Sequence, residues 1–262
     1  LYIDKQEIVT LMTLGKNPEL LVIGYLYNQG FIKKTEDLKS VQVDWDIESA
    51  VVLTRGGISN LEKRLEKRTV TSGCGQGTVF GDMLEDLDKI KLNSPVLRQS
   101  SFYRLLKNIR EYNEVYKKSG AVHGCALCKD EKIEIFIEDV GRHNAADAIA
   151  GYMLLEQIDG SNKLFYTTGR LTSEMVIKVA QMGIPILFSR AGITKMGLEL
   201  SQKLGVTTIS RAAGKHFLVY NGAETVIYDA KPSEKTDSRF NSSGGSEESP
   251  LHERRRGSKL ST

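Results

Sequence analysis

The sequence has 262 residues, of which 40% are hydrophobic, and this is enough for a buried core in one large domain or two small ones. Its 36 basic and 33 acidic residues give a formal net charge of +3, so the overall charge predicts neither nucleic-acid binding nor membrane-surface binding. The sequence has no apolar run long enough to span a membrane and no secretory signal pattern. Three cysteines, an odd number, argue against a secreted disulfide framework and favour a cytoplasmic protein.

The first 120 residues contain three segments whose patterns predict regular structure. A helix is expected from Pro18, with Asn17 as its cap, to a stop at Gly30. Residues 49–54 have the composition of a strand. Over residues 94–116, apolar side chains recur with helical period, which predicts one long amphipathic helix.

After Gly120, apolar runs of strand length alternate with helical patterns, which is typical of an α/β fold with a largely parallel sheet flanked by helices. The expected strands are 133–137, 164–167, 184–188 and 206–210. Helices are expected from about Asn144, over 172–182 and over 194–204. Residues 217–220 and 223–229 are expected to form a hairpin with Asn221-Gly222 as a type I′ turn.

An arginine follows each of these four strands within about five residues: Arg142, Arg170, Arg190 and Arg211. Because parallel strands end at one edge of a sheet, the four guanidinium groups are expected to lie on one rim. Guanidinium groups bind phosphate oxygens through two parallel hydrogen bonds, and helix N-termini add N–H donors. The rim therefore predicts a site for a large polyanion such as a dinucleotide. The alternative is that each arginine only caps a solvated edge.

Residues 138–145 are the most polar stretch that directly follows an expected buried strand. The polar side chains are Glu138, Asp139, Arg142, His143 and Asn144. This turn lies outside the carboxyl end of its strand, where open α/β sheets bind ligands. It is therefore a candidate site. The alternative is that Arg142 pairs with one of the two carboxylates only to hold the turn.

Cys74 lies between Gly73 and Gly75 and has no apolar neighbour before Val79. A structural cysteine is usually set among apolar residues, whereas flanking glycines let a loop present the sulfur to a partner. Cys74 is therefore a candidate reactive thiol. The alternative is an inert loop cysteine.

Cys125 and Cys128 follow His123 in the pattern His-x-Cys-x-x-Cys, which could supply three zinc ligands. A structural zinc site requires four ligands, and no adjacent residue supplies the last. Zinc deaminases have a glutamate two residues after the histidine, where this sequence has Cys125. We therefore expect two packed thiols near the start of a strand, and no zinc.

Four sequence motifs together resemble the formate dehydrogenase accessory sulfurtransferases, the FdhD family. They are Glu138-Asp-Val-Gly-Arg-His-Asn-Ala145, Gly169-Arg170 with Glu174, Gly183-Ile-Pro185 and Gly120-Ala-Val-His123. The resemblance covers nearly all of residues 5–229. It implies a three-layer α/β/α fold of the cytidine deaminase type, with a mixed sheet, a homodimeric state and no zinc.

The resemblance also implies a function. Such a protein is a sulfur carrier that accepts sulfur from a cysteine desulfurase as a cysteine persulfide. It passes the sulfur to the molybdenum cofactor in its bis-molybdopterin guanine dinucleotide form, before that cofactor enters formate dehydrogenase. GDP would then act as a mimic of part of the bound cofactor.

By position, the resemblance makes Cys74 the residue that holds the persulfide, with Gly77 where the family's loop has a second cysteine. Cys74 therefore lacks a loop partner for an internal disulfide. Besides His143 and the arginines of the rim, the implied cofactor-binding segment is Arg211, Ala212, Ala213, Gly214, Lys215 and His216. Glu138, Asp139 and His123 are expected to support the site. We expect His143 to donate to a phosphate or carbonyl oxygen and Asp139 to orient His143 or the arginine, because sulfur transfer from a persulfide does not require a general base.

The chain is expected to consist of an N-terminal α+β portion (1–68), a sulfurtransferase core (69–230) and a tail (231–262). The tail is expected to be disordered, or an artificial or frame-altered extension, and to contribute no site, because it has few apolar residues to bury. Two alternatives come from other functional classes. A chaperone that binds the guanine dinucleotide cofactor without moving sulfur would not need Cys74, and a zinc-dependent deaminase-like hydrolase would need a stoichiometric zinc ion.

Overall fold

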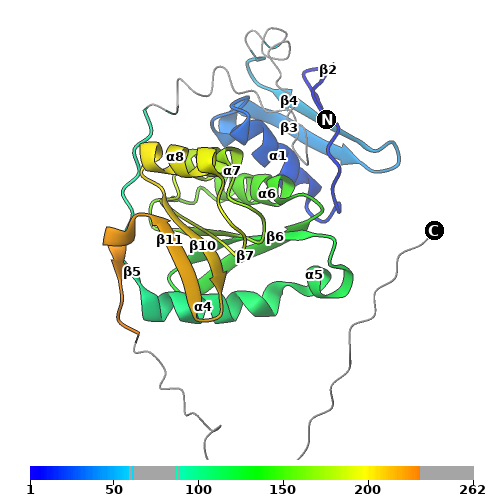
Figure 1. Ribbon diagram of the computed structural model, residues 1–262. Coiled ribbons are helices and arrows are strands. Elements are labelled where there is room, and N and C mark those ends of the chain that lie inside the picture. The colour runs from blue at the N-terminus through cyan, green and yellow to red at the C-terminus, as the bar shows by residue number, and fades with distance from the viewer. Residues whose placement is uncertain (59–60, 62–86, 88, 231–262) are drawn as a thin grey trace, which may run out of the picture. The chain divides into compact units, whose positions relative to one another are not determined.

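The computed structural model describes residues 1–58, 61, 87 and 89–230 of the chain (Figure 1). The candidate reactive residue Cys74, the neighbouring Gly77, the expected boundary after residue 68 and the tail 231–262 lie outside the described residues.

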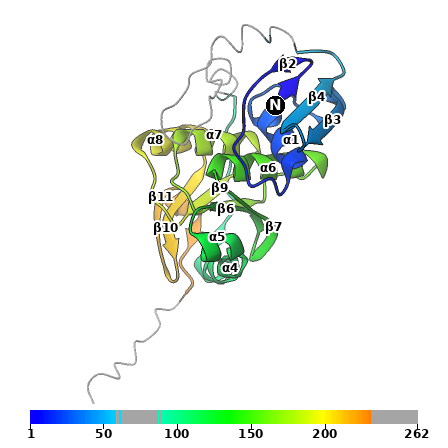
Figure 2. The same cartoon turned by 90° about the vertical axis from the view of Figure 1, so that its right-hand side faces the viewer.

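A six-stranded mixed sheet forms the centre of the fold, with the strand order β11-β10-β9-β8-β6-β7 (Figures 1 and 2). Its strands are β6 (His123–Lys129), β7 (Lys132–Asp139), β8 (Leu164–Thr167), β9 (Ile186–Ser189), β10 (Thr207–Ala213) and β11 (His216–Asn221). β8, β9 and β10 pair in parallel, whereas β6 is antiparallel to both β7 and β8, and β11 is antiparallel to β10. β7, β8, β9 and β10 therefore run in one direction and end at one edge of the sheet, which we call the rim.

Helices cover both faces of this sheet (Figure 1). One face carries α6 (Arg142–Leu155), α7 (Ser173–Gln181) and α8 (Lys195–Leu204), and the opposite face carries α4 (Gln99–Tyr112) and α5 (Glu114–Ser119). Leu127 and Phe165 belong to the core on the α6 side, while Ala126 and Tyr166 belong to the core on the α4 side. The alternating side chains of each strand thus build one core on each face. The predicted three-layer mixed α/β arrangement is confirmed.

The N-terminal part consists of helix α1 (Pro18–Asn28) and a four-stranded sheet of order β2-β1-β4-β3. The strands are β1 (Tyr2–Ile3), β2 (Gln6–Glu7), β3 (Leu38–Asp44) and β4 (Ser49–Thr54), and a 3₁₀ turn, η1 (Thr35–Asp37), precedes β3. Pro18 occupies the first turn of α1 as expected, and Asn17 lies at the cap position, although its side chain makes no capping hydrogen bond. Val22 and Leu26 of α1 share a core with Ile3 and Val52 of this sheet.

Helix α1 crosses α6 at two glycines, Gly24 and Gly151. A Cβ atom on Gly24 would overlap the Asp147 carbonyl oxygen, and one on Gly151 would overlap the Leu20 carbonyl oxygen. The two backbones are therefore in direct contact, which only glycine permits. This contact joins the N-terminal part of the chain to the layer above the central sheet.

The predicted single helix over residues 94–116 is wrong at both ends. Leu97–Arg98 forms β5, which pairs with β12 (Val226–Ile227), and α4 begins only at Gln99. The helix then breaks at Asn113, and α5 begins at Glu114. The Glu138 carboxylate explains the break, because its two oxygens accept hydrogen bonds from the backbone N–H groups of Val115 and Tyr116, each at 2.9 Å. A carboxylate supplied by β7 thus starts a new helix where the apolar pattern alone predicts continuation.

The predicted hairpin at Asn221-Gly222 is also wrong. Its first strand, β11, pairs with β10, so the turn of the real hairpin is Gly214-Lys215. Arg211 has a positive φ of 52° and forms a bulge in β10. Gly222 leads instead into a 3₁₀ turn, η2 (Ala223–Thr225), while the Asn221 side chain donates to the carbonyl oxygen of Val206 at 2.8 Å.

Strand β6 was not among the expected strands. It lies between β7 and β8, so the sheet is mixed rather than largely parallel in this region. The predicted helices over 172–182 and 194–204 end where expected, since Gly183 and Gly205, which follow them, both have the positive φ of a residue that terminates a helix.

The glycine contact between α1 and α6 predicts that Gly24→Ala and Gly151→Ala destabilise the chain. Alanine would gain about 1 kcal/mol of helix propensity, but overpacking typically costs about 1–3 kcal/mol, and here the opposing atoms are backbone that cannot turn aside. We expect a net loss, seen as a lower midpoint of thermal unfolding by a few degrees. Gly56→Ala is the control, because a Cβ atom there meets nothing within 4 Å. Equal unfolding midpoints for Gly24→Ala and Gly56→Ala would contradict the close contact.

Candidate functional site

Arg142, Arg170 and Arg190 follow the carboxyl ends of β7, β8 and β9, as predicted, whereas Arg211 lies within β10, at its bulge, because this strand runs on to Ala213. Arg170, Arg190 and Arg211 are exposed, whereas Arg142 is only 8% exposed. The Arg142 side chain lies against Gly169, where any Cβ atom would overlap it. Arg190 lies on the opposite side of the sheet, beside the hydroxyl of Tyr166 in the α4 core. The rim therefore presents its arginines to both faces of the sheet.

His143 lies in the first turn of α6 and is 2% exposed. Its Nε2 lies 3.2 Å from Oε2 of Glu174 on α7. That carboxylate would favour a protonated ring, but burial, followed by the positive charges of Lys178 and Arg142, lowers the pKa of His143 to about 2. The ring is therefore neutral, and it lies between α6 and α7 rather than at the surface of the rim.

A second buried polar pair lies one helical turn further along the same two helices. Lys178 Nζ donates to Asp147 Oδ1 at 2.5 Å, and Asn28 Nδ2 of α1 donates to the same oxygen at 2.7 Å. Burial raises the pKa of Asp147, while Lys178 opposes that rise. Two polar pairs therefore connect α6 to α7. His143 faces Glu174, and one helical turn further along Asp147 faces Lys178.

Asp139 and Asn144 fasten the N-terminal segment to the rim. Asp139 Oδ2 accepts hydrogen bonds from Thr13 Oγ1 at 2.5 Å and from the N–H of Leu14 at 3.3 Å. Asn144 Nδ2 donates to Asp139 Oδ1 at 2.9 Å and to the Met12 carbonyl at 2.6 Å. Asp139 therefore joins residues 12–14 to the start of α6, whereas the His143 ring that it was expected to orient faces Glu174.

His123 lies at the start of β6, on the rim. Its Nδ1 lies 3.2 Å from Oγ1 of Thr168, and burial together with the Arg142 charge lowers its pKa. The structure thus places His123 close enough to Arg142 for the two charges to influence each other.

Cys125 and Cys128 are fully buried in β6 and belong to the cores on opposite faces of the sheet. Burial raises the pKa of Cys125 to about 12 and also raises that of Cys128. The Cys125 thiol faces Thr167 Oγ1 at 3.4 Å. His123, Cys125 and Cys128 therefore do not form one set of zinc ligands. Across the described residues, no cluster of three or more His, Cys, Asp or Glu side chains is suited to hold a metal ion.

A cavity of about 240 Å³ lies on the α4 side of the rim. Its walls include Arg190 and the segment Ala212, Ala213 and Gly214, which were predicted to bind cofactor. The remaining walls come from α4, α5 and β8, and their residues are Leu106, Ile109, Arg110, Asn113, Tyr116, Lys117 and Tyr166. The α4 and α5 residues were not predicted, because they do not follow strands in the sequence. Lys215 and His216 of the predicted segment are exposed at the β10–β11 turn.

Among the residues that the structure describes, no helix has both the length and the apolar character needed to cross a bilayer.

Comparison with known proteins gives consistent matches. The sequence profile of the FdhD/NarQ family matches residues 1–227. A relative named Sulfur carrier protein FdhD, from Wolinella succinogenes, is 32% identical over 223 residues, which are 84% of this chain and 77% of that protein. A relative of the same name from Sulfurisphaera tokodaii is 34% identical over 229 residues, 86% of this chain and 87% of that protein.

The fold also matches a crystal structure from Desulfotalea psychrophila, described as a formate dehydrogenase accessory protein. The TM-score is 0.68 at 27% sequence identity, and the match covers 86% of each chain.

The burial of His143 predicts a pH-dependent stability. Its pKa is about 2 in the folded chain but near 6.5 in an unfolded one. Below pH 6.5 the unfolded chain therefore takes up a proton that the folded chain does not. The free energy of unfolding is thus unaffected by His143 above pH 6.5 and decreases as the pH falls below that value. Between pH 6.5 and 4.5, the free energy of unfolding of the wild type should fall more steeply than that of His143→Asn, by up to about 1.4 kcal/mol per pH unit.

Urea unfolding at a series of pH values measures this difference. His216→Asn serves as the control, because His216 is exposed on the hairpin. Parallel pH slopes for the wild type and His143→Asn would show that the ring is charged in the folded chain.

Proposed function

Because this chain belongs to the FdhD/NarQ family, we propose that it is a sulfur carrier that serves formate dehydrogenase. The names of its relatives support this proposal, and so does the similar structure described as a formate dehydrogenase accessory protein. The matches extend over most of the chain and of the relatives, so they concern the whole fold and not a shared fragment.

Cys74 is the proposed sulfur acceptor, because the other two cysteines of the chain are not accessible. Sulfur transfer requires an accessible thiolate. Cys125 and Cys128 are buried with raised pKa values, so neither can meet a protein partner in the described fold. The chain has three cysteines, which leaves Cys74 between its two glycines.

In the proposed reaction, the Cys74 thiolate attacks the outer sulfur of a persulfide on a cysteine desulfurase. A new S–S bond forms on Cys74, the old S–S bond breaks, and the donor cysteine leaves as a thiolate. The outer sulfur of the Cys74 persulfide then passes to the bis-molybdopterin guanine dinucleotide cofactor, which is bound as substrate before it enters formate dehydrogenase. In this step the S–S bond breaks, Cys74 leaves as a thiolate, and the cofactor in its reduced form supplies the two electrons that convert the transferred sulfur to sulfide. We propose that the working form is a homodimer.

The guanine dinucleotide part of the cofactor is proposed to bind at the rim. The exposed guanidinium groups of Arg170, Arg190 and Arg211 support this, because phosphates are bound well by arginine. Buried His143 is proposed to support α6 and α7 beneath the rim rather than to move protons, since its neutral ring faces Glu174. A chaperone that binds cofactor without moving sulfur would use the same rim, and only the chemistry of Cys74 separates it from a carrier.

Mass spectrometry tests the carrier role. After incubation with a cysteine desulfurase and cysteine, the peptide that contains Cys74 should gain the mass of one sulfur atom and lose it with reductant. Cys125→Ala and Cys128→Ala should load equally well, provided that they fold. Cys74→Ala should neither load nor restore formate dehydrogenase activity. A Cys74→Ala chain that still restored activity would favour the chaperone.

Guanine nucleotides test the rim. GDP should bind more tightly than guanosine, and the difference should shrink as salt is added, because the diphosphate supplies the charge that the arginines attract. Arg190→Ala should lose about 1.5–3 kcal/mol of binding free energy, or roughly ten- to a hundredfold in affinity for GDP. Isothermal titration calorimetry measures both effects. Equal affinities for GDP and guanosine would exclude phosphate recognition.

A further inference from the structure

A groove of about 320 Å³ lies between the β3–β4 hairpin and the segment that precedes and begins α1. Apolar side chains line both of its walls: Leu11, Met12, Val22, Val43, Trp45 and Ala50. Pockets that bury a drug-sized ligand occupy about 300–1,000 Å³, so this groove has room for one or two large side chains of a partner.

Large apolar side chains at this groove are exposed to solvent. Met12 on one wall is 75% exposed, Trp45 on the other is 54% exposed, and Ile47 on the same hairpin turn is 69% exposed. Single exposed apolar side chains are common, but a group of them around one groove, with a tryptophan among them, is typical of protein–protein contact sites. The groove is therefore a candidate docking surface.

The Trp45 indole is positioned by Gly15. A Cβ atom on Gly15 would lie 2.9 Å from two carbons of the indole ring, so the ring rests on bare backbone at this point. Gly15 also has a φ of +71°, which favours glycine. Because more than half of the Trp45 side chain is still exposed, the rest of the ring is open to a partner.

Both walls of the groove are fixed before a partner arrives. Residues 12–14 are hydrogen-bonded to the side chains of Asp139 and Asn144, at the end of β7 and in the first turn of α6. On the hairpin turn, Asp44 Oδ1 accepts from the N–H of Asp46 at 2.9 Å. Preformed walls lose little conformational entropy on binding, which favours docking.

The groove also carries net negative charge. Four carboxylates contribute to it, Glu7 and Glu48 in the walls and Asp44 and Asp46 on either side of Trp45. In the part of the chain that the structure describes, no lysine or arginine side chain lines the groove or pairs with these carboxylates. The lining group that is cationic is the ammonium of Leu1, which attracts Glu7 and donates to the Val9 carbonyl at 2.8 Å.

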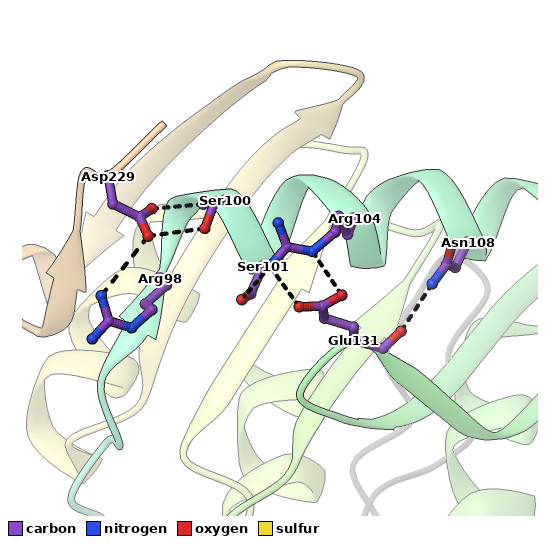
Figure 3. Close-up of polar contacts among 7 residues, drawn as sticks. All are labelled: Arg98, Ser100, Ser101, Arg104, Asn108, Glu131 and Asp229. Carbon is purple, nitrogen blue, oxygen red and sulfur yellow. Dashed lines mark hydrogen bonds and ion pairs between the residues drawn. The ribbon is translucent and has the colours of Figure 1, made fainter. Parts of the chain in front are cut away.

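Exposed carboxylates beside α4, by contrast, have partners within the chain (Figure 3). The Arg104 guanidinium donates to both carboxylate oxygens of Glu131, each at 2.7 Å. Asp229 accepts from the N–H and the hydroxyl of Ser100, each at 2.9 Å. The negative charge of the groove is therefore more available to a basic partner than the charge along α4.

We propose that this groove docks a basic segment of a partner protein, which inserts a large apolar side chain between the walls and places an arginine or lysine against Trp45. Such a cation is attracted both by the indole ring and by the neighbouring carboxylates. The inference goes beyond the proposed function, because it concerns protein docking and requires no sulfur chemistry.

Tryptophan fluorescence of the full chain tests the proposal, because Trp45 is the single tryptophan of the sequence. The probe is a short synthetic peptide that alternates leucine and arginine, and the control peptide has glutamine in place of each arginine. The leucine–arginine peptide should shift the emission to shorter wavelength with saturation. It should bind about tenfold more tightly than the control peptide at low salt, and added salt should reduce this ratio.

Variants locate the binding. Glu7→Gln combined with Glu48→Gln should weaken binding of the leucine–arginine peptide by about three- to tenfold, because exposed ion pairs are individually weak. Glu224→Gln is the matched control, since it removes an exposed carboxylate that does not line the groove, and it should bind like the wild type. For Trp45→Ala, the anisotropy of a fluorescein-labelled peptide should show weaker binding. Equal midpoints of thermal unfolding show that the variants are folded.

Three results would overturn the proposal. Equal affinity for the two peptides, or no change in emission, would show that the groove does not select a basic segment. Equal binding by the wild type and the double glutamine variant would place the peptide elsewhere. An emission shift with protein concentration alone, together with a dimer in sedimentation that Trp45→Ala abolishes, would make a second copy of the chain the occupant. Sulfur loading on Cys74 is a separate measurement, so none of these results bears on the carrier role.

Discussion

The direct contact between the backbones of α1 and α6 is the constraint on which the rest of the fold depends. Gly24 and Gly151 allow the helices to touch, and this approach brings Asn28 close enough to share the buried carboxylate of Asp147 with Lys178. Leaving a buried charge without its partner typically costs about 3–5 kcal/mol, so the three helices cannot separate cheaply once this network has formed. Because α6 begins at the rim, the same contact fixes where the residues of the candidate site lie.

Most polar side chains of residues 138–145 hold other elements of the fold in place. Glu138 starts α5, Asp139 and Asn144 hold residues 12–14, and His143 meets Glu174 between α6 and α7. Consecutive residues thus point to different elements, and each fastens one of them to the end of β7. This explains how a motif at the centre of the candidate site can be rich in ionisable groups and still serve mainly to join parts of the fold.

The regular helices and parallel strands after Gly120 were predictable, because their apolar periods and terminal glycines depend on local sequence. The errors arose where distant residues decide the local structure. A carboxylate on β7 breaks the helix at Asn113, and the bulge at Arg211 with the turn at Gly214 redirects the predicted hairpin. The positions of Arg142, Arg170 and Arg190 after β7, β8 and β9 were predictable, because an arginine that directly follows an apolar strand is visible in the sequence. The α4 and α5 walls of the cavity beside Arg190 were not predictable, because only the folded chain brings the end of α4 beside the β10–β11 turn.

The contact between α1 and α6 also has a consequence for folding during synthesis, because the two helices are far apart in the sequence. Asn28 and Asp147 are separated by 119 residues, so α1 leaves the ribosome long before the helix that covers it exists. At a translation rate of about 5–20 residues per second, the nascent helix waits on the order of ten seconds. Throughout that interval the bare glycine surface of α1 has only the small N-terminal sheet against which to pack. This protein should therefore depend on chaperones most strongly while it is half made.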